Sequence, residues 1–174
     1  MNYRIKEIEK DDLYDFMYVN TYSWNETYRN IMSDEFLDKI LRELDQNVIR
    51  LKNKFEQKKI DEPDYKRFIL YVEDLPVGIF GICKSRDEKY KNSGELCCLY
   101  LLNKTKKQGY GKIMFNRAKE ELKKLGFKDM IIYCLKDNPT NDFYKHMGCH
   151  FVYEKERNIG GKDLIENVYY YEKL

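Results

Sequence analysis

The stretch of residues 95–135 constrains the fold more than any other part of this sequence. Residues 95–102 form a nearly continuous apolar run, which is typical of a central strand buried on both faces. A loop with two glycines follows, and residues 109–125 then place apolar side chains at helical spacing. A second apolar run covers residues 127–135. Strand, helix and strand in this order predict a crossover between parallel strands of one sheet.

The segments on either side of this unit extend the predicted sheet. Residues 67–73 and 77–84 are expected to form a hairpin around Asp74-Leu75-Pro76, and residues 2–8 are expected to be a further strand. Residues 151–156 and 165–173 are expected to be two closing strands around a Gly160-Gly161 turn. Helices are expected after Asp11 or Asp12, after Ser33, and over residues 139–147 with Asn138 as the cap. Residues 52–66 are charged and predict a helix end followed by an exposed loop. The chain is therefore expected to be one α/β domain over residues 1–174, with a central mixed β-sheet and helices on both faces.

Charge and cysteine content exclude several classes of protein. The 32 basic and 30 acidic residues leave a net charge of +2, which gives no reason to expect nucleic acid as a partner. No apolar run is long enough for a membrane span, so no membrane partner is expected. Five cysteines, an odd number, fall mostly in apolar strand-like runs and indicate buried reduced thiols in a cytoplasmic protein. No Cys/His spacing predicts a metal site.

The glycine loop before the long helix has the features of an anion site. Gly109 and Gly111 allow the backbone to approach a ligand closely, and the start of a helix presents unpaired N–H groups at the positive end of its dipole. Lys106, Lys107 and Lys112 add positive charge. The alternative is a plain glycine turn before a helix. The run lacks the third glycine of a dinucleotide-binding fingerprint, which argues against a nucleotide-binding regulator of Rossmann type.

Two segments together resemble the GNAT N-acetyltransferase superfamily. The cofactor motif of that family, Gln/Arg-x-x-Gly-x-Gly/Ala, stands here as Lys106-Lys107-Gln108-Gly109-Tyr110-Gly111. Its downstream pattern stands as Asn138-Pro139 and Phe143-Tyr144-Lys145-His146-Met147-Gly148. Residues 23–31 are similar to the Ser-Trp-x-x-x-Tyr-x-x-Ile segment of many bacterial members. Lys106 departs from the family's Gln or Arg, which keeps the charge but loses the planar bidentate geometry.

The resemblance implies a set of binding residues for acetyl-coenzyme A (acetyl-CoA) and for an amine acceptor. The backbone at the end of the central strand would bind the pantetheine arm, the N–H groups of the loop would hold the pyrophosphate, and the tyrosine of the downstream pattern would lie near the cofactor sulfur. The expected cofactor-binding residues are Leu101, Leu102, Lys106, Lys107, Gln108, Gly109, Tyr110, Gly111, Lys112, Asn138 and Tyr144. The expected acceptor-binding residues are Trp24, Glu26 and Tyr28.

Acetyl transfer to an amine requires a base for the ammonium proton, a donor for the oxyanion and a proton donor for the departing thiolate. Tyr144 is the expected proton donor, because tyrosine stays protonated at neutral pH. Glu95 is the candidate base: it precedes Gly109 by fourteen residues, the spacing found in some histone-acetylating relatives, and an apolar strand would raise its pKa. The alternatives are a strand-end Glu95 in water or in an ion pair, with deprotonation through water.

The sequence thus predicts an N-acetyltransferase that moves the acetyl group of acetyl-CoA onto a primary amine by direct attack in a ternary complex. A polyamine or a peptide amine is the favoured acceptor, because acidic residues including Glu26 and Asp34 gather around the Trp24–Tyr28 segment. The alternative function is a GNAT-fold acyl-CoA sensor without turnover. A homodimer remains open.

Overall fold

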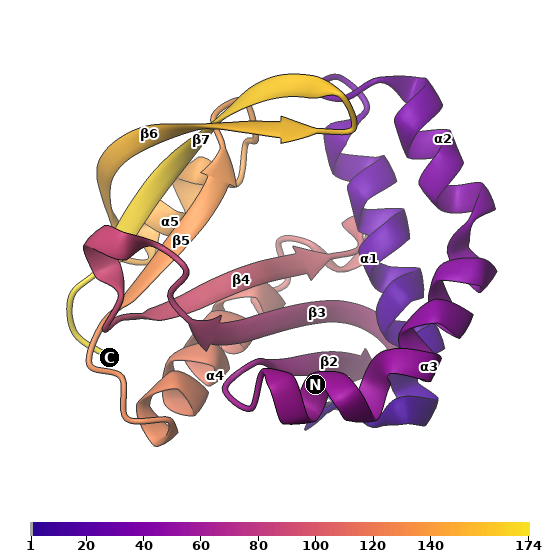
Figure 1. The fold of residues 1–174 in the computed structure, drawn as a ribbon, viewed down its shortest axis with the longest axis horizontal. Helices are drawn as coiled ribbons and strands as arrows, with labels where there is room; N and C mark the ends of the chain where they lie inside the picture. The colour runs from indigo at the N-terminus through magenta and orange to yellow at the C-terminus, as the bar shows by residue number, and fades with distance from the viewer. Residues whose placement is uncertain (1) are drawn as a thin grey trace.

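The computed structural model describes residues 2–174, and Figure 1 shows its ribbon. A seven-stranded sheet has the order β1-β2-β3-β4-β5-β7-β6, and β4 and β5 are its parallel pair. The strands are β1 (Tyr3–Glu7), β2 (Lys66–Val72), β3 (Leu75–Lys84), β4 (Gly94–Leu101), β5 (Met130–Leu135), β6 (His150–Ile159) and β7 (Lys162–Tyr171). The α-helices are α1 (Leu13–Tyr28), α2 (Asp34–Arg42), α3 (Leu44–Asp61), α4 (Tyr110–Lys124) and α5 (Asn141–His146). No helix among residues 2–174 is both long enough and apolar enough to cross a membrane.

Helices cover both faces of the sheet, as the sequence predicts. On one face, Met114 and Phe115 of α4 and Tyr144 of α5 share a core with residues of β2 to β5 and β7. On the other face, α1 and α3 pack against β2 and β3 through a separate core that includes Phe16 and Phe55. A third cluster joins α2 to the β6–β7 hairpin. The expected mixed sheet with two helical layers is confirmed.

The sheet opens between β4 and β5 (Figure 1). The two strands pair over three positions, from Gly94 opposite Met130 to Leu96 opposite Ile132, and then diverge. On its other edge β4 carries a bulge, because Ile82 pairs with Leu96 while the preceding Gly81 pairs with Cys98. The half of β4 beyond Leu96 therefore has an edge that faces β5 without pairing to it.

The helix end and exposed loop predicted over residues 52–66 are misplaced, because α3 continues to Asp61 and leaves only residues 62–65 as the loop before β2. Leu44, Val48 and Phe55 lie on one buried side of this helix, so three apolar residues at helical spacing outweigh the charged residues between them. The cap at Ser33 is confirmed, since its Oγ accepts the N–H of Phe36 at 3.3 Å.

Two predicted turns differ in detail. The β2–β3 turn is formed by Glu73 and Asp74, both with positive φ, and Leu75 and Pro76 already belong to β3. Helix α5 begins at Asn141 with Thr140 as its cap residue, rather than after Asn138. Asn138 stabilises the preceding turn instead, because its Oδ1 accepts the N–H of Thr140 at 2.9 Å.

Candidate functional site

A cavity of about 620 Å³ lies where β4 and β5 diverge. Its walls come from β4, from β5, from the start of α4 and from α5. Leu99, Tyr100 and Leu101 line it along the strand edge that has no partner beyond Leu96. Backbone N–H and C=O groups on such an edge can pair with an extended ligand that contains amides.

The N-terminus of α4 forms one end of this β4–β5 cavity. Lys107 and Gly109 both have positive φ, at 63° and 87°. The first backbone hydrogen bond of the helix runs from the N–H of Ile113 to the carbonyl oxygen of Gly109, at 3.2 Å. The N–H groups of residues 108–112 have no hydrogen-bond acceptor within residues 2–174. Five consecutive free donors at a helix N-terminus suit a phosphate group.

Three lysines surround these donors: Lys106, Lys107 and Lys112 all line the cavity. Burial lowers the pKa of Lys106 from its usual value, and the nearby Glu26 opposes this effect. A Cβ on Gly109 would meet nothing within 4 Å, and one on Gly111 would lie 3.4 Å from the Phe143 ring. The absence of both side chains leaves the approach to the N–H groups open.

Tyr144 lies in the same cavity, on α5. It is buried at 5% exposure, and its hydroxyl has no hydrogen-bond partner within residues 2–174. Burial raises the pKa of Tyr144 well above its usual value, so the phenol stays protonated. Asn138 also lines this cavity, and its Nδ2 donates to the hydroxyl of Tyr28 at 3.4 Å.

A second cavity, of about 280 Å³, lies on the α1 side of the sheet. Trp24 and Tyr28 of α1, two of the three expected acceptor-binding residues, line it. The two cavities share wall residues at the point where β4 separates from β5. These shared residues are Tyr28, Cys97, Cys98, Tyr100 and Tyr133. A molecule in the α1-side cavity and one in the β4–β5 cavity would therefore meet at the middle of β4.

Glu95 lies in the wall of the α1-side cavity, fully buried, and its surroundings differ from the expected apolar strand. Its carboxylate accepts hydrogen bonds from the guanidinium of Arg86, and its Oε2 also accepts the Arg86 backbone N–H at 3.2 Å. Glu95 raises the pKa of Arg86 through these hydrogen bonds. Burial of this carboxylate is therefore offset by an ion pair with a guanidinium that is itself largely exposed.

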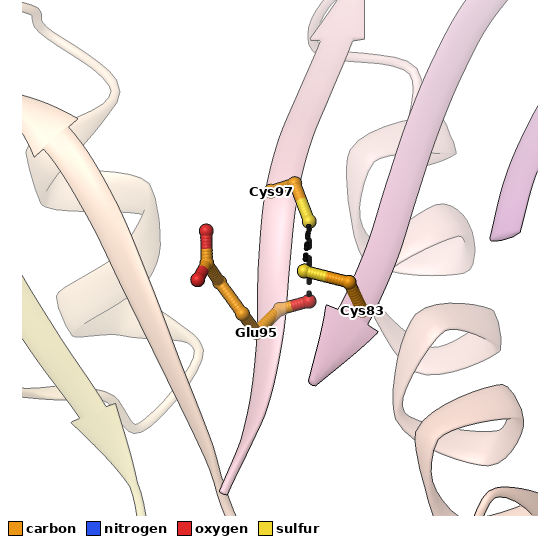
Figure 2. Close-up of side chains that lie close together, drawn as sticks. All are labelled: Cys83, Glu95 and Cys97. Atoms are coloured by element: carbon orange, nitrogen blue, oxygen red, sulfur yellow. Dashed lines mark hydrogen bonds between the residues drawn. The ribbon is translucent and has the colours of Figure 1, made fainter. Parts of the chain in front are cut away.

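Two thiols lie beside Glu95. The Sγ atoms of Cys83 and Cys97 are 3.0 Å apart, and Figure 2 shows them facing each other while the Glu95 carboxylate turns away. One donor atom from each of the three residues lies within 4.8 Å of the others, a spacing that could hold a metal ion. Arg86 already neutralises the carboxylate, so the group is better described as an ion pair next to a thiol pair.

Several expected site residues have other roles. Leu102 does not line the β4–β5 cavity: its N–H donates to Val77 at 3.0 Å and its C=O accepts the N–H of Thr105. The Tyr110 side chain is buried in the core, so the backbone of this residue is what reaches the site. Glu26 lies outside both cavities and accepts the backbone N–H of Asn103 at 2.7 Å, which anchors the loop after β4.

A family model for the Acetyltransferase (GNAT) family matches residues 16–149 of this chain. That range covers most of the chain, including most of α1, the diverging strands, the loop before α4, and Tyr144. The chain belongs to the GNAT acetyltransferase family. The GNAT resemblance of the two sequence motifs is thereby confirmed, and so is the predicted fold class.

Named relatives agree with the GNAT assignment. The chain is 25% identical over 165 residues to the uncharacterized N-acetyltransferase YuaI of Bacillus subtilis, covering 93% of this chain and 88% of the relative. The structure of the PaiA N-acetyltransferase of Thermoplasma acidophilum, in complex with coenzyme A, superposes with a TM-score of 0.71 at 20% identity over the full length of both chains. YncA of Salmonella typhimurium, with acetyl-CoA, superposes with a TM-score of 0.67 at 12% identity, covering 98% of this chain and 93% of that one.

Sequence reasoning on this GNAT chain missed the arginines of the α1-side cavity. Arg67, Arg86 and Arg157 all line that cavity, yet they come from β2, from the end of β3 and from β6. No spacing in the sequence links them, because the sheet order brings them together. A signal existed for Arg86 alone: it lies between the predicted strand of residues 77–84 and the apolar run of residues 95–102 that begins with Glu95.

Proposed function

We propose that this chain is an N-acetyltransferase that transfers the acetyl group of acetyl-CoA to a primary amine of a small molecule or peptide, by direct attack in a ternary complex. The observation that carries the proposal is the meeting of two cavities at β4. One has the free edge of β4 and the anion-binding turn, which is the row of free N–H groups of residues 108–112. A phosphopantetheine cofactor needs both features. The other offers an aromatic and charged pocket to an acceptor. Two substrates bound in this way meet without a covalent enzyme intermediate.

The chain's own groups fit the cofactor part by part. The N–H groups of residues 108–112 and the three lysines would bind the pyrophosphate, and the free edge of β4 through Leu101 would pair with the amides of the pantetheine arm. Asn138 would contact the arm from the opposite wall. Acetyl-CoA supplies the activated thioester carbonyl.

Two side chains are proposed to move protons. The amine arrives as an ammonium ion and must lose a proton before its nitrogen can attack; Glu95, fixed by Arg86 in the wall of the α1-side cavity, accepts it. The new C–N bond forms as the C–S bond breaks: the hydroxyl proton of Tyr144 passes to the leaving thiolate, and the second proton of the amine nitrogen passes to the resulting phenolate, while Glu95 releases its proton to water. Because burial raises the pKa of Tyr144, the phenol keeps its proton until the thiolate leaves.

The cysteines at the meeting point are poorly suited to act as nucleophiles. Cys97 and Cys98 line both cavities, so either could be reached by a thioester. Burial raises the pKa of Cys98 to about 12, and contact with Cys83 raises that of Cys97. The reactive thiolate is thus scarce at neutral pH, which favours direct transfer to the amine.

The test is release of free thiol from acetyl-CoA by the purified protein with a panel of primary amines. The panel includes amino acids, diamines, polyamines and peptides. Amine-dependent thiol release, with the acetylated amine identified by mass spectrometry, is the expected result. Tight binding of coenzyme A in calorimetry without turnover of any amine would instead support an acyl-CoA sensor, and absence of coenzyme A binding would refute both functions.

A further inference from the structure

The wall of the α1-side cavity carries more positive than negative side chains. Two carboxylates line it, and each is paired: Glu95 with Arg86, and Glu166 with Arg157 at 3.3 Å. Arg67 lines the same cavity and forms no ion pair with any carboxylate of residues 2–174. The cavity therefore carries one cation that no protein carboxylate neutralises. Such a site attracts an anionic group and disfavours a second ammonium.

The acidic residues that favoured a polycationic acceptor are engaged elsewhere. Asp34 and Asp38 both accept hydrogen bonds from Arg29, at 3.2 and 2.7 Å, and neither lines the cavity. Glu26 binds the backbone N–H of Asn103. These three acidic residues of the N-terminal segment thus stabilise local structure and do not line the α1-side cavity.

Arg67 is placed to define one end of a bound acceptor. It lies across β3 from Cys98, because Arg67 pairs with Gly81 and Gly81 pairs with Cys98. Two strand spacings of about 4.8 Å separate Arg67 from the point where the cavities meet, so the span is roughly 10 Å. Its guanidinium stacks on the Tyr65 ring with 4.5 Å to the centroid, which orients the planar group.

Gly81 keeps the path between Arg67 and Cys98 open. A Cβ at this position would lie 3.2 Å from the Cys98 sulfur and 3.7 Å from the Tyr65 ring. On the α1 wall of the cavity, the indole N–H of Trp24 is buried without a hydrogen-bond partner in the described chain. The groups that lack a partner here are donors, and they suit an acceptor that brings oxygen atoms.

We infer that the acceptor carries a carboxylate as well as its reacting amine, and that Arg67 binds this carboxylate while the amine reaches the middle of β4. The inference rests on the proposed acetyltransferase function and adds the substrate class. Small amino acids and related amino-carboxylates fit it. Arg67 is then the residue that sets specificity, since its fork of N–H donors matches two carboxylate oxygens.

Matched pairs of amines test the substrate class. Each amino acid is compared with the amine that lacks its carboxylate and with its amide, which keeps the size but removes the charge. We expect kcat/KM to be about 10-fold or more higher for the carboxylate member, on the scale of a charge-assisted hydrogen bond. Calorimetry with coenzyme A-loaded protein gives the same comparison without turnover. If amines without a carboxylate react or bind equally well, the inference fails while the acetyltransferase function stands.

Substitution of Arg67 locates the contact. Arg67→Gln should erase the preference for the carboxylate member by raising its KM at least about 10-fold, with coenzyme A affinity and the melting temperature nearly unchanged. Arg67→Glu should reverse the preference towards diamines. Arg50→Gln, which removes an exposed arginine of α3 outside both cavities, is the matched control. An unchanged preference in folded Arg67→Gln would overturn the inference.

Discussion

Arg86 holds the carboxylate of Glu95 in the wall of a cavity, through both its guanidinium and its backbone N–H. The pair joins the end of β3 to the start of β4. A fully buried carboxylate is thereby kept in one orientation, facing the space where we place the amine. Whether this carboxylate only supports the wall or also takes a proton can be measured.

Glu95→Gln should lower kcat on the order of 10²-fold or more, because the amide cannot accept the ammonium proton. Glu166→Gln is the matched control, since Glu166 is a buried carboxylate of the same cavity and is also paired with an arginine. Equal losses in the two variants would assign both carboxylates a structural role, and an unaffected Glu95→Gln would leave the base to another group.

Tyr144→Phe should reduce kcat by a similar factor while the dissociation constant of acetyl-CoA changes little, because the ring remains and the hydroxyl is lost. Burial raises the pKa of Tyr144, so the wild-type rate should not decline through ionisation of this phenol below pH 10. Single-turnover kinetics and calorimetry separate the two effects. Wild-type turnover in the variant would assign Tyr144 to packing alone.

Gly109→Ala should weaken coenzyme A binding beyond what its small loss of folding stability explains. Gly126→Ala is the matched control: the two glycines have φ of 87° and 91°, and at neither would a Cβ meet an atom within 4 Å. Both variants should therefore lose a similar amount of stability, about 1 kcal/mol, from left-handed backbone strain. Only Gly109 belongs to the anion-binding turn. Equal coenzyme A affinity in the two variants, by calorimetry, would remove the phosphate assignment.

The stability of the protein should fall at alkaline pH through Tyr28. Burial raises the pKa of Tyr28 to about 12, whereas the unfolded chain ionises near pH 10. The contribution of the buried, neutral Tyr28 to the free energy of unfolding is therefore fully present below pH 10. It is lost as the pH rises towards 12, by about 1 kcal/mol per pH unit. Denaturant unfolding at pH 9, 10 and 11 should show a shallower decline for Tyr28→Phe than for the wild type. Parallel declines would contradict the shifted pKa.

Local patterns in the sequence predicted the parts of the fold that depend on periodicity and turn chemistry. The crossover of β4, α4 and β5 follows from two apolar runs around a helix, and the Gly160-Gly161 turn between β6 and β7 follows from two glycines that both take positive φ. The predicted end of helix α3 comes too early, because charged residues separate its apolar positions. Val48 and Phe55 are four and eleven residues after Leu44.

The site was predictable only where its residues are close in sequence. The turn before α4 and Tyr144 belong to short motifs, so the sequence could predict a common site for them, and both line the β4–β5 cavity. The surroundings of Glu95 and the position of Arg67 depend on strand pairing, on a bulge and on the order of the sheet, and these are tertiary properties.

The tip of the β6–β7 hairpin presses on α2. A Cβ on Gly160 would lie 2.6 Å from the Phe36 ring, and Lys162 donates to the backbone oxygen of Ile31 at 2.7 Å. The same hairpin contributes Arg157 and Glu166 to the α1-side cavity. If the acceptor binds in this cavity as we propose, its specificity is set jointly by two ends of the chain, and a hairpin grafted from another family member would require the matching α2 segment to be exchanged with it.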